Sequence, residues 1–178
     1  MIAAVGARGQ AGQSGAMTDA AFRIGPVGTP ADLAAVARLF EAYAASLAVD
    51  LAYQDFATEL ASLPGKYAAP DGALLLARDL RGEALGCVAL RPMPFAGCCE
   101  MKRLFVAPAG RGLGLGRALV GAVLAEAARI GYREMRLDTL GFMTEAIGLY
   151  RTLGFAPIDP YYDTPVAGTI FLGRRLGA

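Results

Sequence analysis

The apolar residues of the chain recur with two different periods. Alternation at every second residue and short apolar runs predict strands, whereas apolar residues three and four positions apart predict helices. Strands are therefore expected over residues 20–24, 73–78, 83–90, 98–106, 133–139, 155–158 and 168–176. Helices are expected over residues 31–48, 50–63, 115–130 and 143–153. This order predicts a mixed α/β fold with a strand–loop–helix–strand unit at its centre and no internal repeat.

Length and composition favour a single domain. The chain has 178 residues, of which 55% are hydrophobic and only 19% charged, which is enough apolar material for one well-packed core. Residues 1–18 are rich in Gly, Ala, Ser and Gln without periodicity, and we expect them to form a flexible leader, with Met17 as an alternative start. Residues 19–178 are then expected to form the one domain.

The charge balance and the cysteines indicate the compartment and the kinds of partner to expect. A formal net charge of +1 gives no overall field that would draw the chain to nucleic acid or to an anionic membrane. No apolar run approaches the roughly 20 residues that span a bilayer, and the N-terminus lacks a signal-peptide pattern. Cys87, Cys98 and Cys99 form no CxxC pair and are typical of small buried residues in a reducing compartment. We expect a cytoplasmic protein without a nucleic-acid or membrane partner.

The absence of histidine from the sequence limits the possible chemistry. It excludes Ser-His and Cys-His nucleophilic pairs, zinc held by histidine, and acid–base catalysis by imidazole. Any proton transfer must use Asp, Glu, Tyr, Cys, Lys or water. We expect no metal site.

A glycine-rich segment joins the strand at 98–106 to the helix that begins at Leu115, and it reads Arg111-Gly112-Leu113-Gly114-Leu115-Gly116-Arg117. It lacks the Lys-Ser/Thr of a Walker loop, and Arg117 stands where a GxGxxG motif needs its third glycine. A nucleotide-binding protein is therefore the least favoured interpretation. Glycines let phosphate oxygens approach the main chain, and the first N–H groups of a helix attract anions. Arg111 or Arg117 can neutralise the remaining charge. An anion site is predicted; the alternative is a tight turn that needs glycine only for packing.

Residues 111–116 match the R/Q-x-x-G-x-G/A signature, and from Ala73 to Phe171 the chain resembles the GNAT N-acetyltransferases, with "MKRLFVAP" before the signature and "IGLYRTLGF" after it. The resemblance implies a central, mostly antiparallel twisted sheet of about six to seven strands with a parallel splayed pair, flanked by about four helices. It also implies that acetyl-CoA is the co-substrate and that the loop amides hold its pyrophosphate. The residues expected to bind it are Leu104, Phe105, Val106, Arg111, Gly112, Leu113, Gly114, Leu115, Gly116 and Arg117.

The resemblance assigns a role to Tyr150. This residue stands where the family often has a tyrosine that protonates the departing coenzyme A thiolate, and the alternative is a buried tyrosine that only packs. Met143 occupies the position of an asparagine that commonly contacts the pantetheine arm in the family, so that contact is expected to differ here.

A second candidate catalytic residue is Glu100. An attacking amine must lose a proton, since only its uncharged form attacks a thioester. Glu100 lies on the strand before the loop, where histone-type members of the family carry a catalytic glutamate. Its alternative role is an ion pair with Lys102 or Arg103. Asp138 or a chain of waters could take the proton instead, and no Ser or Cys nucleophile is required.

Together these features predict an acetyl-CoA-dependent N-acetyltransferase that acts on a primary amine of a small molecule or a peptide. The alternative is a non-catalytic acyl-CoA-binding regulatory module, and the resemblance is also compatible with a homodimer. Residues 40–67 and 159–163 are expected to bound the acceptor. Tyr161 and Tyr162 either stack on it or pack within the protein.

Overall fold

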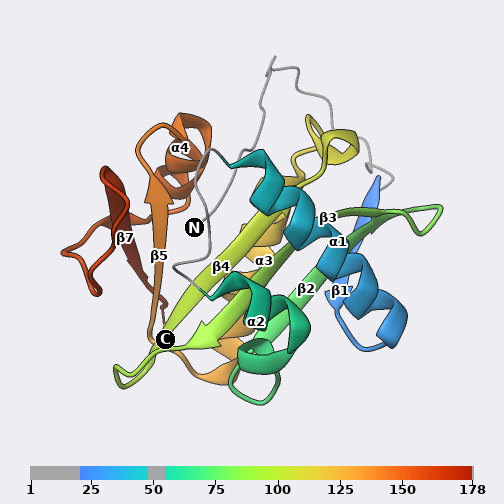
Figure 1. Ribbon diagram of the computed structural model, residues 1–178. Coiled ribbons are helices and arrows are strands. Elements are labelled where there is room, and N and C mark those ends of the chain that lie inside the picture. The colour runs from blue at the N-terminus through green and yellow to red at the C-terminus, as the bar shows by residue number, and fades with distance from the viewer. Residues whose placement is uncertain (1–20, 48–54, 178) are drawn as a thin grey trace.

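The structure is a computed structural model that describes residues 21–47 and 55–177. The leader expected over residues 1–18 lies outside these residues. A seven-stranded sheet in the order β1-β2-β3-β4-β5-β7-β6 forms the centre of the described part (Figure 1). Its strands are β1 Phe22–Pro26, β2 Ala73–Asp79, β3 Ala84–Pro92, β4 Cys98–Val106, β5 Glu134–Leu140, β6 Ala156–Pro157 and β7 Thr169–Arg175.

Helices cover both faces of this sheet. Figure 1 shows α1 and α2 in front of the sheet and α3 behind it, with α4 beside the far end of β5. In the described residues the helices are α1 Pro30–Ser46, α2 Phe56–Ala61, α3 Leu115–Ile130 and α4 Thr144–Thr152, with short 3-10 turns η2 Gly65–Tyr67 and η3 Pro108–Gly110. The predicted mixed α/β architecture is therefore confirmed.

The start of α1 follows from its local sequence. The Thr29 hydroxyl accepts a hydrogen bond from the Asp32 amide at 3.1 Å, and the Asp32 carboxylate accepts one from the Thr29 amide at 3.2 Å. This reciprocal pair satisfies amides that have no partner inside the helix, and Pro30 supplies the helical φ angle at the first position. The second helix was expected over residues 50–63. Its described part, α2, is shorter, and residues 50–54 lie outside the described residues.

Strand β4 is buried along its whole length because helices pack on both of its faces. All nine residues from Cys98 to Val106 are buried, and these include three charged ones, Glu100, Lys102 and Arg103. A buried charge is costly unless it is paired. Partners for these three side chains therefore have to come from neighbouring elements.

The parallel pair in the centre of the sheet is splayed, as expected. Strands β4 and β5 pair only through Cys98–Glu134, Cys99–Met135 and Glu100–Arg136, and every other strand pair is antiparallel. Beyond Glu100 the two strands continue without pairing. In the C-terminal half of β4, the main-chain groups that face β5 therefore make no hydrogen bonds to that strand.

A β-bulge at Arg103 changes the direction of side chains in this half of β4. Phe105 pairs with Cys87 and Lys102 with Ala89, so Val88 alone lies opposite both Arg103 and Leu104. Arg103 has a positive φ of 56°, which non-glycine residues rarely adopt. In a regular strand Arg103 would face away from Lys102. The bulge turns it instead toward Tyr43 of α1 and Phe56 of α2.

Candidate active site

The glycine loop leaves space above its main chain. Gly112 and Gly114 have φ angles of 80° and 73°, so both positions favour glycine for conformational reasons alone. A Cβ atom added at either glycine would meet no other atom within 4 Å. The positive φ angles agree with a tight turn. The open space, however, shows that packing against this chain is not what requires glycine here, and it leaves room for a ligand to approach.

The first turn of α3 has no side-chain cap. Gly114 occupies the N-cap position, and no side chain accepts a hydrogen bond from the first helical amides. Arg117 donates a hydrogen bond to the Thr152 hydroxyl at 2.8 Å and so joins α3 to α4. Arg111 is exposed and lines a cavity of about 350 Å³ together with Phe142 and Met143. Of the two predicted arginines, Arg111 is thus placed beside this cavity, and Arg117 is bonded to α4.

The three predicted cofactor residues of β4 have buried side chains. The side chains of Leu104, Phe105 and Val106 are buried in the core. Their main chain borders the opening between β4 and β5, so any contact with a ligand there has to involve backbone groups.

Tyr150 is buried completely in α4, and its hydroxyl has no hydrogen-bond partner among the described residues. The ring packs edge-on against Phe155 with 5.9 Å between centroids. Burial, and after it the negative charge of Asp138, raise the pKa of Tyr150 well above its usual value, so the phenol keeps its proton at neutral pH. A buried hydroxyl without a partner is destabilising by about 1–3 kcal/mol.

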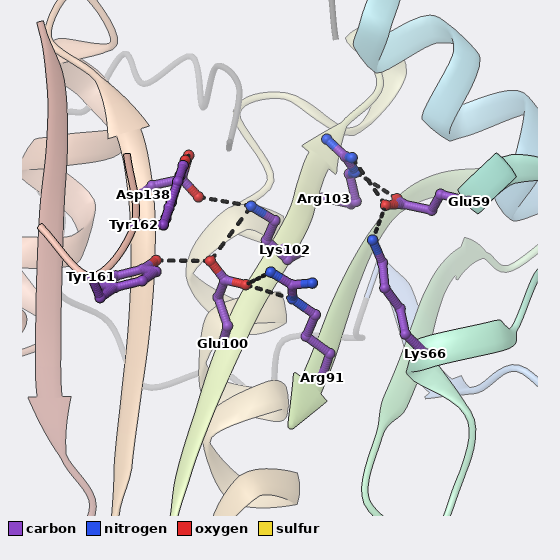
Figure 2. A network of polar contacts seen from close by, with 9 residues as sticks. All are labelled: Glu59, Lys66, Arg91, Glu100, Lys102, Arg103, Asp138, Tyr161 and Tyr162. Carbon is purple, nitrogen blue, oxygen red and sulfur yellow. Dashed lines mark hydrogen bonds and ion pairs between the residues drawn. The ribbon is translucent and has the colours of Figure 1, made fainter. Parts of the chain in front are cut away.

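Glu100 lies at the last position of β4 that pairs with β5, and three neighbouring side chains hold its carboxylate. Arg91 of β3 donates to Oε2 at 2.6 Å, the Tyr161 hydroxyl donates to Oε1 at 2.8 Å, and Lys102 Nζ lies 3.5 Å from Oε1 (Figure 2). Burial by itself raises the pKa of Glu100, but the charges of Lys102 and Arg91 outweigh it and lower the pKa below its usual value. The side chain is thus a stable carboxylate, as in the alternative role, although Arg91 takes the place expected for Arg103.

Lys102 continues this network across the opening between the strands. Its Nζ lies 2.8 Å from Oδ1 of Asp138 on β5, and the Tyr162 hydroxyl donates to Oδ2 of Asp138 at 3.0 Å. Burial by itself lowers the pKa of Lys102, but the charges of Asp138 and Glu100 outweigh it and raise the pKa. Tyr161 and Tyr162 both pack on Phe171, with centroids 5.0 and 5.2 Å away. The two tyrosines therefore position the carboxylates as well as packing.

Another set of charges lies on the side of β4 that α1 and α2 cover. Arg103 donates from Nε to Oε1 of Glu59 at 2.7 Å and from Nη2 to Oε2 at 3.1 Å, and Lys66 pairs with the same carboxylate. Burial by itself raises the pKa of Glu59, but its bonds to Arg103 and Lys66 lower the pKa to about 2. Glu59 and Lys66 lie within residues 40–67, which were expected to bound the acceptor, but neither was singled out by the sequence analysis. Glu59 lies 44 positions from Arg103 in the chain, so no local pattern could have indicated this pair.

Comparison of the chain with models of known protein families identifies its family. The model of the acetyltransferase (GNAT) family matches residues 35–155, which include most of α1, the central strands, the glycine loop and Tyr150. The chain belongs to the GNAT acetyltransferase family. It is accordingly an acyltransferase, and its sheet, splayed strand pair and loop are those expected from the resemblance.

Relatives and solved structures agree with this assignment. An uncharacterized N-acetyltransferase of Schizosaccharomyces pombe is 42% identical over 149 residues, which are 84% of this chain and 91% of that protein. A GCN5-related N-acetyltransferase from Kribbella flavida has 25% identity and a TM-score of 0.69, over 88% of this chain and 98% of that one. A phosphinothricin acetyltransferase from Sinorhizobium meliloti, solved in complex with AcCoA, shares the fold with 20% identity and a TM-score of 0.65, over 88% and 89% of the two chains.

The described part of this GNAT protein contains neither a metal-binding cluster nor a membrane-spanning helix. Within residues 21–47 and 55–177, no group of three or more Cys, Asp or Glu side chains is placed to hold a metal ion. None of the helices in the same residues is long and apolar enough to cross a membrane.

Proposed function

We propose that the protein transfers an acetyl group from acetyl-CoA directly to a primary amine of a small molecule or a peptide. The observation that carries the proposal is the buried Tyr150 hydroxyl without a partner, near Asp138 of the strand that diverges from β4. A phenol that keeps its proton and lacks a protein acceptor is suited to donate that proton to a leaving group.

The residues of the loop and of β4 fit coenzyme A. Uncapped amides at the start of α3, open space above Gly112 and Gly114, and the exposed Arg111 suit a pyrophosphate. The unpaired edge of β4 from Lys102 to Val106 offers main-chain groups to the pantetheine arm. Acetyl-CoA supplies an activated thioester to this site when it is bound.

Proton movements in the reaction are assigned to two side chains. The uncharged amine attacks the thioester carbonyl carbon, a C–N bond forms, the C–S bond breaks, and the electron pair goes to sulfur. Tyr150 donates the proton that the sulfur takes up. Glu100 is the candidate acceptor for the proton that the amine loses, directly or through water, with Asp138 as the alternative. Both carboxylates are ion-paired and have lowered pKa values, which weakens either as a base.

The proposal is tested by measuring thiol release from acetyl-CoA with a panel of primary amines, alongside calorimetry of acetyl-CoA binding. Release that depends on an amine, with the N-acetyl product identified by mass spectrometry, supports an acetyltransferase. Tight binding of acetyl-CoA without release by any amine would favour the non-catalytic module. Absence of binding would overturn both.

A further inference from the structure

On the side of β4 covered by α1 and α2, three buried hydrogen-bond donors have no partner among the described residues. Within the described residues, Nη1 of Arg103, the hydroxyl of Tyr43 and the hydroxyl of Tyr67 make no hydrogen bond. All three side chains are at most 1% exposed. Buried polar groups in proteins almost always have a partner, because an unmade hydrogen bond is destabilising. Three such donors from three different elements indicate a site whose partner is a ligand.

The three donors belong to one neighbourhood, which we call the Arg103 cluster: Tyr43, Tyr67 and Arg103. The Arg103 guanidinium lies 5.8 Å from the centroid of the Tyr43 ring. Burial raises the pKa of Tyr67. After burial, the negative charge of Glu59 raises this pKa further and the positive charge of Arg103 lowers it, so both groups lie near Tyr67. Figure 2 shows that the unbonded nitrogen of Arg103 points away from Glu59, so the pair with Glu59 does not use this end of the guanidinium.

Within the described residues, Lys66 and Arg103 both pair with the carboxylate of Glu59, so this set of charges carries an excess of one positive unit. The ion pairs of Arg91 and Lys102 with Glu100 and Asp138 form a separate set. Lys66 and Arg91 remain about one third exposed, and a cavity of about 150 Å³ lies against Glu59, Lys66 and Tyr67. Unused donors together with a positive excess favour an anion with several acceptor oxygens.

The cluster is also close to the proposed reaction centre. Burial raises the pKa of Tyr43, and beside the opposing charge of Arg103, the neighbouring groups that act on it include Asp138 and Tyr150. The geometry agrees with this: Lys102, the residue before Arg103, bonds to Asp138 across the splayed strands at 2.8 Å, and Arg103 lies beside rings of α1 and α2.

We propose that the Arg103 cluster binds a carboxylate of the acceptor, so that the substrates of this enzyme are amino acids or other amines that carry a carboxylate. This inference rests on the proposed acetyltransferase function. Nη1 of Arg103 and the two hydroxyls donate to the carboxylate oxygens and orient the amine toward the thioester. Glu59 holds the other side of the guanidinium and keeps it in place.

The test compares amino acids with their amides as acceptors in the thiol-release assay. The amide keeps the amine and the side chain but removes the carboxylate charge, and it makes the amine less basic, so that more of it is uncharged. Intrinsic reactivity thus favours the amide. We expect at least one amino acid to react with a kcat/KM about 10- to 100-fold above that of its amide, the effect of losing charge-assisted hydrogen bonds.

Tyr67→Phe and Tyr43→Phe each remove one donor and keep the ring. Each is expected to raise KM for the amino acid about 10-fold while leaving KM for the amide unchanged. The matched control is Tyr132→Phe, which removes a hydroxyl bonded to the Asp71 carbonyl at 2.6 Å outside the cluster and should change neither KM. Equal rates with acids and amides, or a preference that neither variant alters, would overturn the inference and leave the acetyltransferase proposal standing.

Two further experiments distinguish a carboxylate on the acyl donor, and a failure of the proposed acetyltransferase function, from the inference itself. Faster turnover of succinyl-CoA than of acetyl-CoA with a neutral amine, abolished by Tyr67→Phe, would place the carboxylate on the acyl donor and overturn its assignment to the acceptor. If no amine of either series releases thiol, the proposed function fails. Calorimetry of the same amino acids with the protein saturated with coenzyme A then decides the inference: binding weakened by Tyr67→Phe supports it, and no binding contradicts it.

Discussion

Lys102 on β4 and Asp138 on β5 form a buried ion pair, with 2.8 Å between Nζ and Oδ1, across the part of the sheet where the two strands no longer pair. Main-chain hydrogen bonds end at Glu100, and side-chain charges connect the strands beyond it. The pair therefore joins the walls of the opening in which the proposed reaction takes place.

Breaking this pair on one side should destabilise the protein. Lys102→Met removes the cation that pairs with both Asp138 and Glu100 inside the protein, and breaking a buried ion pair on one side typically lowers the free energy of unfolding by about 3–5 kcal/mol. Adding Asp138→Asn in the same chain removes one of the two negative charges and should recover part of the loss. Denaturant unfolding of the three proteins measures this, and a Lys102→Met variant as stable as the parent would contradict it.

Acid should weaken the protein through Glu59. Its pKa is lowered from 4.5 to about 2 in the folded protein, so its stabilising contribution is fully present above pH 4.5 and is lost as the pH falls toward 2. Glu59→Gln should therefore be less stable at neutral pH and should show a shallower fall in stability between pH 4.5 and 2. Glu41→Gln, at an exposed position of α1, is the control. Parallel stability curves for the parent and Glu59→Gln would argue against the ion pair.

Tyr150→Phe should be a stable but slow enzyme. The hydroxyl has no partner to lose, so the melting temperature and the affinity for coenzyme A should hardly change. General-acid assistance is typically worth about 10²–10⁴-fold, and turnover should fall by that amount. Melting temperature, calorimetry and thiol release on one preparation test this. A variant that is less stable yet turns over normally would assign Tyr150 to packing.

Glu100→Gln separates a base from a positioning residue. If Glu100 accepts the proton of the amine, the rate at neutral pH should fall by about 10²–10⁴-fold and recover in part as rising pH supplies uncharged amine. If Glu100 only positions Arg91 and Tyr161, the pH–rate profile should keep its shape and KM should rise. Glu126→Gln removes a half-buried carboxylate of α3 that pairs with Arg129, far along the chain from Glu100, and should leave the profile unchanged.

Gly114→Val should impair coenzyme A binding specifically. Valine is strained at a φ of 73°, and its side chain would enter the open space above the loop. Gly82→Val imposes a similar strain, at a φ of 89° and with equally open surroundings, in the turn between β2 and β3. Calorimetry should show at least about a tenfold loss of affinity only for Gly114→Val, which is about 1.4 kcal/mol. An equal loss in both variants would point to a general effect on folding.

Local sequence signals were sufficient for most of the secondary structure. The Thr29–Asp32 capping box marks the start of α1, and the alternation around Met135 and Leu137 marks β5, because the groups involved lie within a few residues of one another. The loop at 111–116 was readable for the same reason. Its positive φ angles and the bare start of α3 are properties of consecutive residues.

The side-chain network could not be read in this way. Glu59 meets Arg103 across 44 positions of the chain and Lys102 meets Asp138 across 36, so both pairs depend on strand order and register. A regular β4 would have sent Lys102 and Arg103 to opposite faces, and the sequence contains no sign of the bulge that brings Arg103 to the helix side. The sequence by itself therefore determined most of the elements, the family and the conformation of the glycine loop. Tertiary structure alone decided which charges pair and which buried donors remain without a partner, because these depend on where distant segments meet.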